Sequence, residues 1–228
     1  MIKLTPILLI VLYALAMWAF SAWRLRAELN ARSTPLTDPR LAAALDRLGA
    51  AMGLGRIRAH VYEIAPVNGL AAPDGRVFLT RGFLDQLDAG RVTEPELASV
   101  IAHELGHVAH GHTRRRMLDF AGQNVVRAVL VGVFGRMIPL VGPWLGSLIA
   151  TALAARLSRE DEYQADAFAA ALMIKAGFGT GPQKALLGRL DAMTGAGGSP
   201  GLAWARSHPP ADRRIAAIEA LEARWQVR

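Results

Sequence analysis

The sequence predicts an α+β protein that is mostly helical, with a small sheet and one transmembrane helix at its N-terminus. Hydrophobic residues make up 52% of the 228 residues, which is high for a wholly soluble domain. Only two short stretches, residues 57–64 and 76–80, have the composition of strands. Several longer stretches begin and end with the residue types that cap helices, so helices should dominate.

The N-terminal segment predicts a membrane anchor over residues 1–24. Leu4–Trp23 contains no charged residue, and as a helix rising ~1.5 Å per residue it would span ~30 Å, the thickness of a bilayer core. Arg24 follows directly, and a cleaved signal peptide is disfavoured because the apolar run is long and no clean A-x-A site follows it. We therefore expect an uncleaved single-span anchor in a membrane, such as a bacterial inner membrane. Counting Lys and Arg on its two sides favours a cytoplasmic C-terminal domain.

One folded domain is predicted over residues 38–228, after a polar linker at 25–37. Asp38 and Pro39 are the residue types expected at the cap and first turn of a helix, and Gly53 is a natural stop. The domain should therefore begin with a helix that ends near Gly53.

Two strands and several helices should follow. Turn residues between Val67 and Gly75 separate the strands predicted at 57–64 and 76–80. Thr93-Glu-Pro-Glu96 is a capping box, so a helix should begin there. Later helices are predicted over residues 158–176 and 181–193 and from Pro210 onward, the last with an apolar stripe of Ile215, Ile218, Leu221 and Trp225.

Cysteine and charge limit the possible sites and partners. The chain has no cysteine, so disulfides and thiolate metal sites are excluded, and a transition metal would need His, Asp or Glu. The net charge is +7, but the only tight basic cluster, Arg114–Arg116, has no interleaved aromatic residues. We therefore expect no nucleic-acid partner. Contact with anionic lipid headgroups and a solvated helix end explain the cluster equally well.

The motif HELGH at His103–His107 predicts a metal site on the helix that starts after the capping box. His103 and His107 are four residues apart, so they share one face of a helix and can hold one ion. Neutral imidazole suits zinc. Glu104 would lie beside the ion, where it can act as a general base. This spacing can also arise by chance on a surface helix, so a third ligand is needed.

Two kinds of third ligand are conceivable. The extended motif HExxHxxGxxH would place a histidine at position 113, but Thr113 stands there. The other kind is a carboxylate from a later helix, and the acidic segment Ser158–Asp166 is the candidate. Its Glu162 and Asp166 are four apart, so one can bind the metal while the other orients a histidine.

Four segments resemble, in sequence and in their order along the chain, the HtpX-like and Ste-type (CAAX prenyl protease) zinc metallopeptidases, peptidase family M48. In chain order they are NGLAAPDGRVFLTRG at 68–82, HELGH at 103–107, SREDEYQAD at 158–166 and SHPPADRRI at 207–215. The resemblance covers roughly residues 40–220. It implies a zincin-like metallopeptidase domain with one zinc ion per chain.

The resemblance also implies roles for single residues. Glu162 would be the third zinc ligand, with Asp166 as its supporting partner. His208 would stabilise the oxyanion or cap the metal in a resting state. Arg214 would support that loop or contact substrate. Asn68 and the strand after it would line the cleft and pair with extended substrate.

Several other residues are assigned no role. Gly69 stands where many family members have Ala, and Gly106 takes a variable position. We expect neither to touch the chemistry. His112 falls where several members carry a histidine, but both His110 and His112 have poor spacing for the ion. We expect both to be polar histidines at a helix end. His60 is a lone strand histidine.

The apolar stretch 125–157 lies between the two metal-binding segments. Because HELGH and Glu162 must meet on one side of a membrane, this stretch crosses twice or not at all. Arg136–Pro143 divides it into halves shorter than the ~20 residues that a crossing needs. We expect an apolar hairpin packed on the domain or at the bilayer surface, with double spanning as the second possibility.

These features together predict a membrane-anchored zinc metalloendopeptidase with a glutamate general base. By analogy with the family, its substrates would be misfolded or membrane-associated proteins in protein quality control. One alternative is a catalytically silent, zinc-stabilised membrane adaptor, although such a site needs no Glu104. Another is a basic protein of the membrane surface without metal, which would leave the four ordered segments unexplained.

Overall fold

The structure is a computed structural model of the chain, and it describes residues 4–55, 57–72, 74–112, 129–138, 141–195 and 210–226. The chain forms two compact units. Unit 1 consists of Met1–Ala31 and Thr113–Ser158, and unit 2 of Arg32–His112 and Arg159–Arg228. The described part is mostly helical with one small sheet, so the predicted α+β class is confirmed.

Unit 2 contains a four-stranded sheet in the order β1-β2-β4-β3. The strands are β1 (Ser33–Pro35), β2 (Ala59–Tyr62), β3 (Gly69–Ala71) and β4 (Val77–Thr80). The central strands β2 and β4 are parallel, and each edge strand is antiparallel to its neighbour. The sequence predicted the two central strands. It missed the edge strands, because three residues are too few to show an alternating pattern.

Two helices of the same unit connect or follow the strands, one between β1 and β2 and the other after β4. Helix α2 (Pro39–Met52) has the predicted ends: the Asp38 side chain accepts a hydrogen bond from the Arg40 N–H, and Gly53 adopts φ 69°. Helix α3 (Arg81–Asp88) starts directly after β4 and was not predicted.

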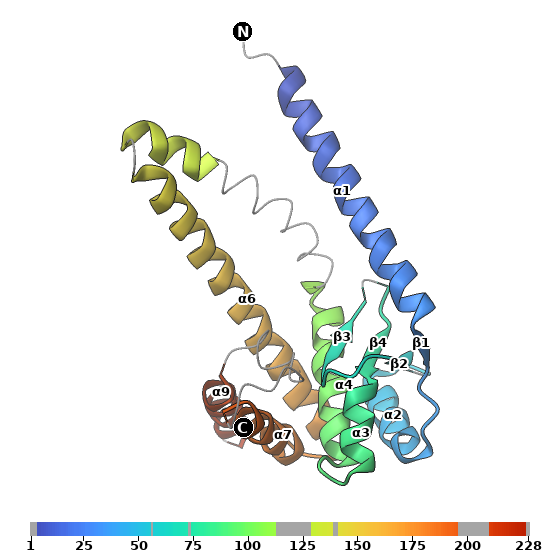
Figure 1. Ribbon diagram of the computed structural model, residues 1–228. Helices are drawn as coiled ribbons and strands as arrows, with labels where there is room; N and C mark the ends of the chain where they lie inside the picture. Colours follow the sequence, from blue (N-terminus) through green and yellow to red (C-terminus); the bar gives the residue numbers. More distant parts are fainter. Residues whose placement is uncertain are drawn as a thin grey trace. The chain divides into compact units, whose positions relative to one another are not determined.

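Helix α4 (Glu94–Ala109) is the central element of unit 2 (Figure 1). Its capping box is present, because the Glu96 carboxylate accepts hydrogen bonds from the Thr93 N–H (2.7 Å) and hydroxyl (3.0 Å). The helix contacts α2, α7, β3 and β4. Leu97 and Ile101 of this helix are fully buried in the apolar core of unit 2. The helix is therefore packed against both the sheet and the neighbouring helices.

Three helices complete the described chain after residue 141. Helix α6 (Gly142–Lys175) includes the predicted helix but starts at Gly142 instead of residue 158. Helices α7 (Gly181–Gly195) and α9 (Ala211–Gln226) lie side by side (Figure 1). In the predicted stripe of α9, Ile218 is buried, but Trp225 is 38% exposed.

Unit 1 contains α1 (Leu4–Ala31), a helical segment at 129–137 and the first part of α6. The segment 129–137 and α6 approach closely, because a Cβ atom on Gly146 would lie 2.7 Å from the Leu130 carbonyl carbon. Large apolar side chains are exposed in this unit: Leu12, Tyr13, Leu15, Met17, Phe20 and Trp23 on α1, and Val129, Val133, Met137, Ile138, Val141, Trp144, Leu148 and Ile149 around the close approach.

Over the described ranges, no helix is both long enough and apolar enough to cross a membrane. The transmembrane helix of the predicted fold stays a prediction.

Candidate metal centre

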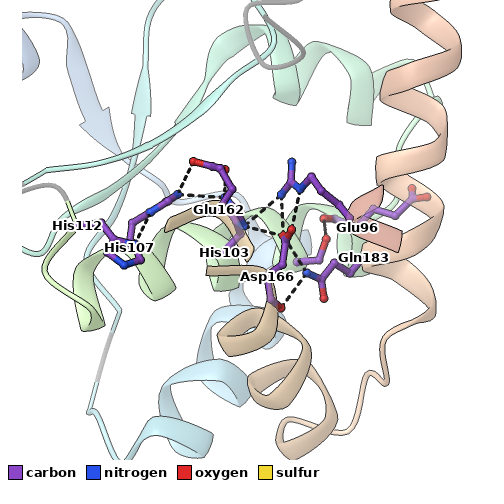
Figure 2. A network of polar contacts seen from close by, with 9 residues as sticks. Glu96, His103, His107, His112, Glu162, Asp166 and Gln183 are labelled. Carbon is purple, nitrogen blue, oxygen red and sulfur yellow. Dashed lines mark hydrogen bonds and ion pairs between the residues drawn. The ribbon is translucent and has the colours of Figure 1, made fainter. Parts of the chain in front are cut away.

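Helices α4 and α6 bring three potential metal ligands together. His103 and His107 lie one turn apart on α4, and Glu162 comes from α6; all three are buried (Figure 2). The two Nε2 atoms are 3.2 Å apart. The Glu162 carboxylate lies 3.3 Å from His103 Nε2 and 3.4 Å from His107 Nε2. The two distances are to different oxygens, Oε2 for His103 and Oε1 for His107, so the carboxylate group as a whole faces both nitrogens. The three side chains therefore offer ligand atoms that all lie within 4.8 Å of one another.

These separations fit a tetrahedral metal ion. Ligands at the ~2.0–2.1 Å typical of zinc lie about 3.3–3.4 Å apart when they point to the corners of a tetrahedron. Among the described residues, this group has three members, whereas structural zinc sites usually have four protein ligands. Three protein ligands are the number found in catalytic zinc sites, where water or substrate takes the fourth position.

Gly106 allows the two helices to approach so closely. A Cβ atom there would lie 3.0 Å from both the Cα and the carbonyl oxygen of Ala165 on α6. Backbone atoms cannot move away cheaply, so this position needs a residue without a side chain. We had expected Gly106 to have no bearing on the chemistry. That expectation stays a prediction, and the structure adds that the glycine lies where the ligand-bearing helices meet.

Asp166 and Arg214 lie on the Nδ1 side of the His103 ring, away from the other metal ligands. The Nδ1 atom of His103 lies 3.0 Å from Asp166 Oδ1. Arg214, on α9, donates two hydrogen bonds to the same carboxylate, at 2.7 and 2.6 Å. Because Nδ1–H donates to Asp166, the lone pair of Nε2 is left for a metal. The structure therefore places Asp166 behind His103, and it places Arg214 on Asp166.

The charges of this buried cluster are mutually compensated. Burial alone would lower the pKa of His103, but its hydrogen bonds with Asp166 and Glu162 outweigh burial and raise that pKa to about 9. Burial would raise the pKa of Asp166, but Arg214 and His103 hold it well below its usual range. Burial also disfavours the Arg214 cation, yet Asp166 raises its pKa. Asp166 and Arg214 are therefore a charged pair.

Glu104 lies against the edge strand β3. Its side chain is only 3% exposed, and a Cβ atom on Gly69 would lie 3.1 Å from Glu104 Oε1. The same Cβ atom would lie 2.7 Å from Val100 Cγ1. The expectation that Gly69 does not touch the chemistry is therefore wrong. The missing side chain leaves room for the carboxylate beside the ligands.

Asn68 stands at the start of β3. Its backbone N–H donates to the Thr80 hydroxyl (2.9 Å), and its carbonyl accepts from the Thr80 N–H (3.0 Å). These bonds fix the beginning of the strand that packs on α4. Because β3 pairs with β4 alone in the described sheet, its outer edge can accept a further strand.

His112 is the residue that the sequence analysis missed. It is 1% exposed, and its Nδ1 atom lies 3.0 Å from Nδ1 of His107 (Figure 2). Helix α4 ends at Ala109, and Gly111 adopts φ 67°, which turns the chain back toward the helix. His110, in contrast, is an exposed helix-end residue, as expected. Gly111, between the two histidines, is the sequence feature from which this turn could have been predicted.

Two predicted features lie outside the described residues. His208 falls in the range 196–209, and the basic cluster Arg114–Arg116 falls in 113–128. Their roles stay predictions. His60, for which no role was predicted, lies on β2 with its ring beside that of Phe78.

Comparison with known proteins identifies the family. Residues 35–222, which include every residue of the centre described above, match the sequence model described as Peptidase family M48. The chain belongs to peptidase family M48. The family recognised from the four sequence segments is thereby confirmed.

Three relatives are similar to this M48 chain at 29–30% sequence identity. It is 30% identical to Protease HtpX of Nitrosococcus oceani over 92% of this chain and 80% of that protein. It is 29% identical to Metalloprotease YcaL of Escherichia coli over 77% of this chain, and 29% identical to Metalloprotease LoiP of the same organism over 60%. The matched parts span 66% of YcaL and 53% of LoiP, so the chain covers less than two thirds of either.

Proposed function

We propose that the protein is a zinc-dependent metalloendopeptidase. The observation that carries this proposal is the convergence of two Nε2 atoms and one carboxylate, within 3.2–3.4 Å of one another, beside a buried glutamate. The names of the relatives, metalloprotease and protease, support the same activity. The alternative of a silent adaptor lacks support, because a purely structural site gives no reason to bury Glu104 beside the ligands.

Different residues would bind the zinc ion, transfer the proton and orient the ligands during hydrolysis. His103, His107 and Glu162 would hold the zinc ion, which supplies Lewis acidity for activating water and polarising the peptide carbonyl. Glu104 accepts the proton of the attacking water and then delivers it to the leaving amine. Asp166, fixed by Arg214, keeps the His103 ring in the tautomer that presents Nε2. His208 is proposed to stabilise the oxyanion.

The free edge of β3 is the proposed site for the substrate backbone. An extended peptide can add to an exposed strand edge through main-chain hydrogen bonds. Gly69 of this strand is adjacent to Glu104, so a peptide bound there would pass the general base. Asn68, at the start of the strand, would contact the peptide. Such binding depends little on side chains, which suits misfolded or membrane-associated protein substrates.

We also propose that unit 1 attaches the protein to a membrane, with the peptidase domain on the cytoplasmic side. Leu4–Trp23 carries no charge, and the exposed large apolar side chains described above lie mainly in this unit. Close approach at Gly142 and Gly146 resembles the small-residue contacts common between helices in membranes.

The variant Glu104→Gln tests the activity. It removes the proton acceptor but keeps the side-chain volume, so the purified full chain should still bind one zinc ion while casein cleavage falls by at least ~100-fold. Glu94→Gln, near the start of the same helix, is the matched control and should cleave like the wild type. Equal cleavage by Glu104→Gln and the wild type would overturn the proposed mechanism.

A further inference from the structure

We propose that His112 is a positioning residue that fixes the tautomer and the ring orientation of the metal ligand His107. It does so through a hydrogen-bonded series that runs from His107 to His112 to Gln164. This inference rests on the proposed metal centre.

The geometry of His107 determines which nitrogen carries its proton. Its Nε2 atom faces His103 Nε2 and the Glu162 carboxylate, so this nitrogen must present a lone pair to a metal. The proton then sits on Nδ1 and is donated to His112 Nδ1, 3.0 Å away. His112 is thus the acceptor behind one ligand, as Asp166 is behind the other.

The remaining contacts of His112 complete the series. Because its Nδ1 atom accepts, its own proton sits on Nε2, which lies 3.1 Å from the amide oxygen of Gln164 on α6. The Gln164 amide nitrogen donates to Glu160 at 3.2 Å, which orients the amide with its oxygen toward His112. The Asp161 carboxylate lies 3.5 Å from the same Nε2 atom. Each acceptor in the series therefore meets a donor.

The backbone is also arranged to place His112 there. Gly111 at φ 67° reverses the chain just after α4, a conformation that a residue with a side chain rarely adopts. The His110 ring stacks on the His112 ring at 16°, with centroids 5.2 Å apart. The His112 ring is thereby held from outside as well as by its two hydrogen bonds.

The two histidine ligands differ in the charge of the group that accepts the hydrogen bond from their Nδ1 atom. His103 is backed by a carboxylate whose charge is balanced by Arg214, whereas His107 is backed by a neutral imidazole.

The test compares His112→Leu with His112→Asn in the full chain, using zinc itself as the probe. Leu removes the acceptor, whereas the Asn side-chain oxygen can occupy the place of Nδ1. Competition with a chelator should give about 10–100-fold weaker zinc binding for His112→Leu. His112→Asn should restore binding close to that of the wild type. Glu94→Gln, at the opposite end of α4, is the control and should bind zinc normally.

Two further measurements separate positioning from folding. The visible spectrum of the cobalt-loaded protein should change in His112→Leu and return in His112→Asn, because it reports the geometry of the ligands. If His112→Leu does not fold, Gln164→Leu removes the next acceptor in the series, and it should also weaken zinc binding and shift the cobalt spectrum.

The outcomes are distinct. Equal zinc affinity in wild type and His112→Leu, or equal losses in His112→Leu and His112→Asn, would overturn the inference. In the fallback case, wild-type zinc binding by Gln164→Leu would overturn it. A wild-type chain that binds no zinc would instead overturn the proposed function.

Discussion

His103 carries a proton in the metal-free protein that must leave when a metal binds. With its pKa raised to about 9, this histidine is protonated at neutral pH even though it is buried. A ligand nitrogen must be deprotonated to coordinate zinc, so metal and proton compete for the same site. This competition links the metal affinity to pH.

We therefore predict that zinc binding weakens as the pH falls below 9. One displaced proton corresponds to about a tenfold loss of affinity per pH unit. The stability of the metal-free protein changes with pH in the opposite direction, because it is the protonated form of His103 that stabilises the fold. The contribution of His103 is fully present below its ordinary pKa of 6.5 and is lost as the pH rises through about 9. Chelator competition at pH 6, 7, 8 and 9 measures the first effect, and an affinity that does not change with pH would contradict it.

The predictability of single residues depended on whether their contacts are local. His103, Glu104 and His107 could be assigned because helical spacing alone puts them at one site. The residues themselves left Glu162 and Asp166 interchangeable, since the rotation of α6 decides which carboxylate faces the metal, and only the family resemblance distinguished them. His112 could not be placed, because its approach to His107 depends on the turn at Gly111.

At the scale of elements, the centre depends on how closely α4 and α6 pack. Each helix is fixed separately: α4 by its capping box and its burial, α6 by buried residues such as Ala169 and Met173. At Gly106 the two backbones approach closely, because a Cβ atom there would lie 3.0 Å from the Ala165 backbone. A side chain at this position would therefore push apart the helices that carry the histidines and Glu162.

We predict that Gly106→Ala destabilises the protein by about 1–3 kcal/mol, because the added methyl group forces a packed backbone to shift. It should also weaken zinc binding, since separating the helices separates the ligands. Gly188→Ala on α7 is the matched control. No atom lies within 4 Å of its added methyl group, so it should stabilise the protein by about 0.4–1 kcal/mol. Denaturant unfolding and chelator competition measure both effects. Similar behaviour of the two variants would show that the close approach is unimportant.

Elements with clear end signals were predicted well from the sequence. Asp38 and Gly53 defined α2, and Thr93 with Glu96 defined the start of α4. The short elements β1, β3 and α3 were missed because they contain few residues and depend on neighbours that are distant in the sequence. The start of α6 was placed too late, because its first half has an apolar composition that also suits a separate hairpin.

At the scale of the whole molecule, the two units differ in surface character. Unit 2 buries most of its apolar side chains in two clusters, whereas unit 1 leaves many exposed. Large exposed apolar surfaces usually mark contact with a partner or a lipid phase. The proposal of membrane attachment follows from this contrast together with the uncharged segment Leu4–Trp23.

We predict that the full chain stays in the membrane fraction after extraction at alkaline pH. A fluorescent protein fused to the C-terminus should be fluorescent, and alkaline phosphatase fused at the same place should be inactive, because both fusions would lie in the cytoplasm. Deletion of residues 1–24 should reduce membrane retention. Complete release of the full chain into the supernatant would contradict the attachment, and an active phosphatase fusion would contradict the orientation.

The central claim is that one zinc ion is held by two histidines of α4 and one glutamate of α6. X-ray absorption at the zinc edge of the full chain, loaded with one equivalent of zinc and carrying His208→Ala so that this histidine cannot cap the metal, tests it most directly. We expect two imidazole nitrogens and two oxygens at ~2.0–2.1 Å, and loss of most bound zinc when Glu162→Ala is added. A third coordinating imidazole, or full zinc retention with Glu162→Ala, would contradict the claim.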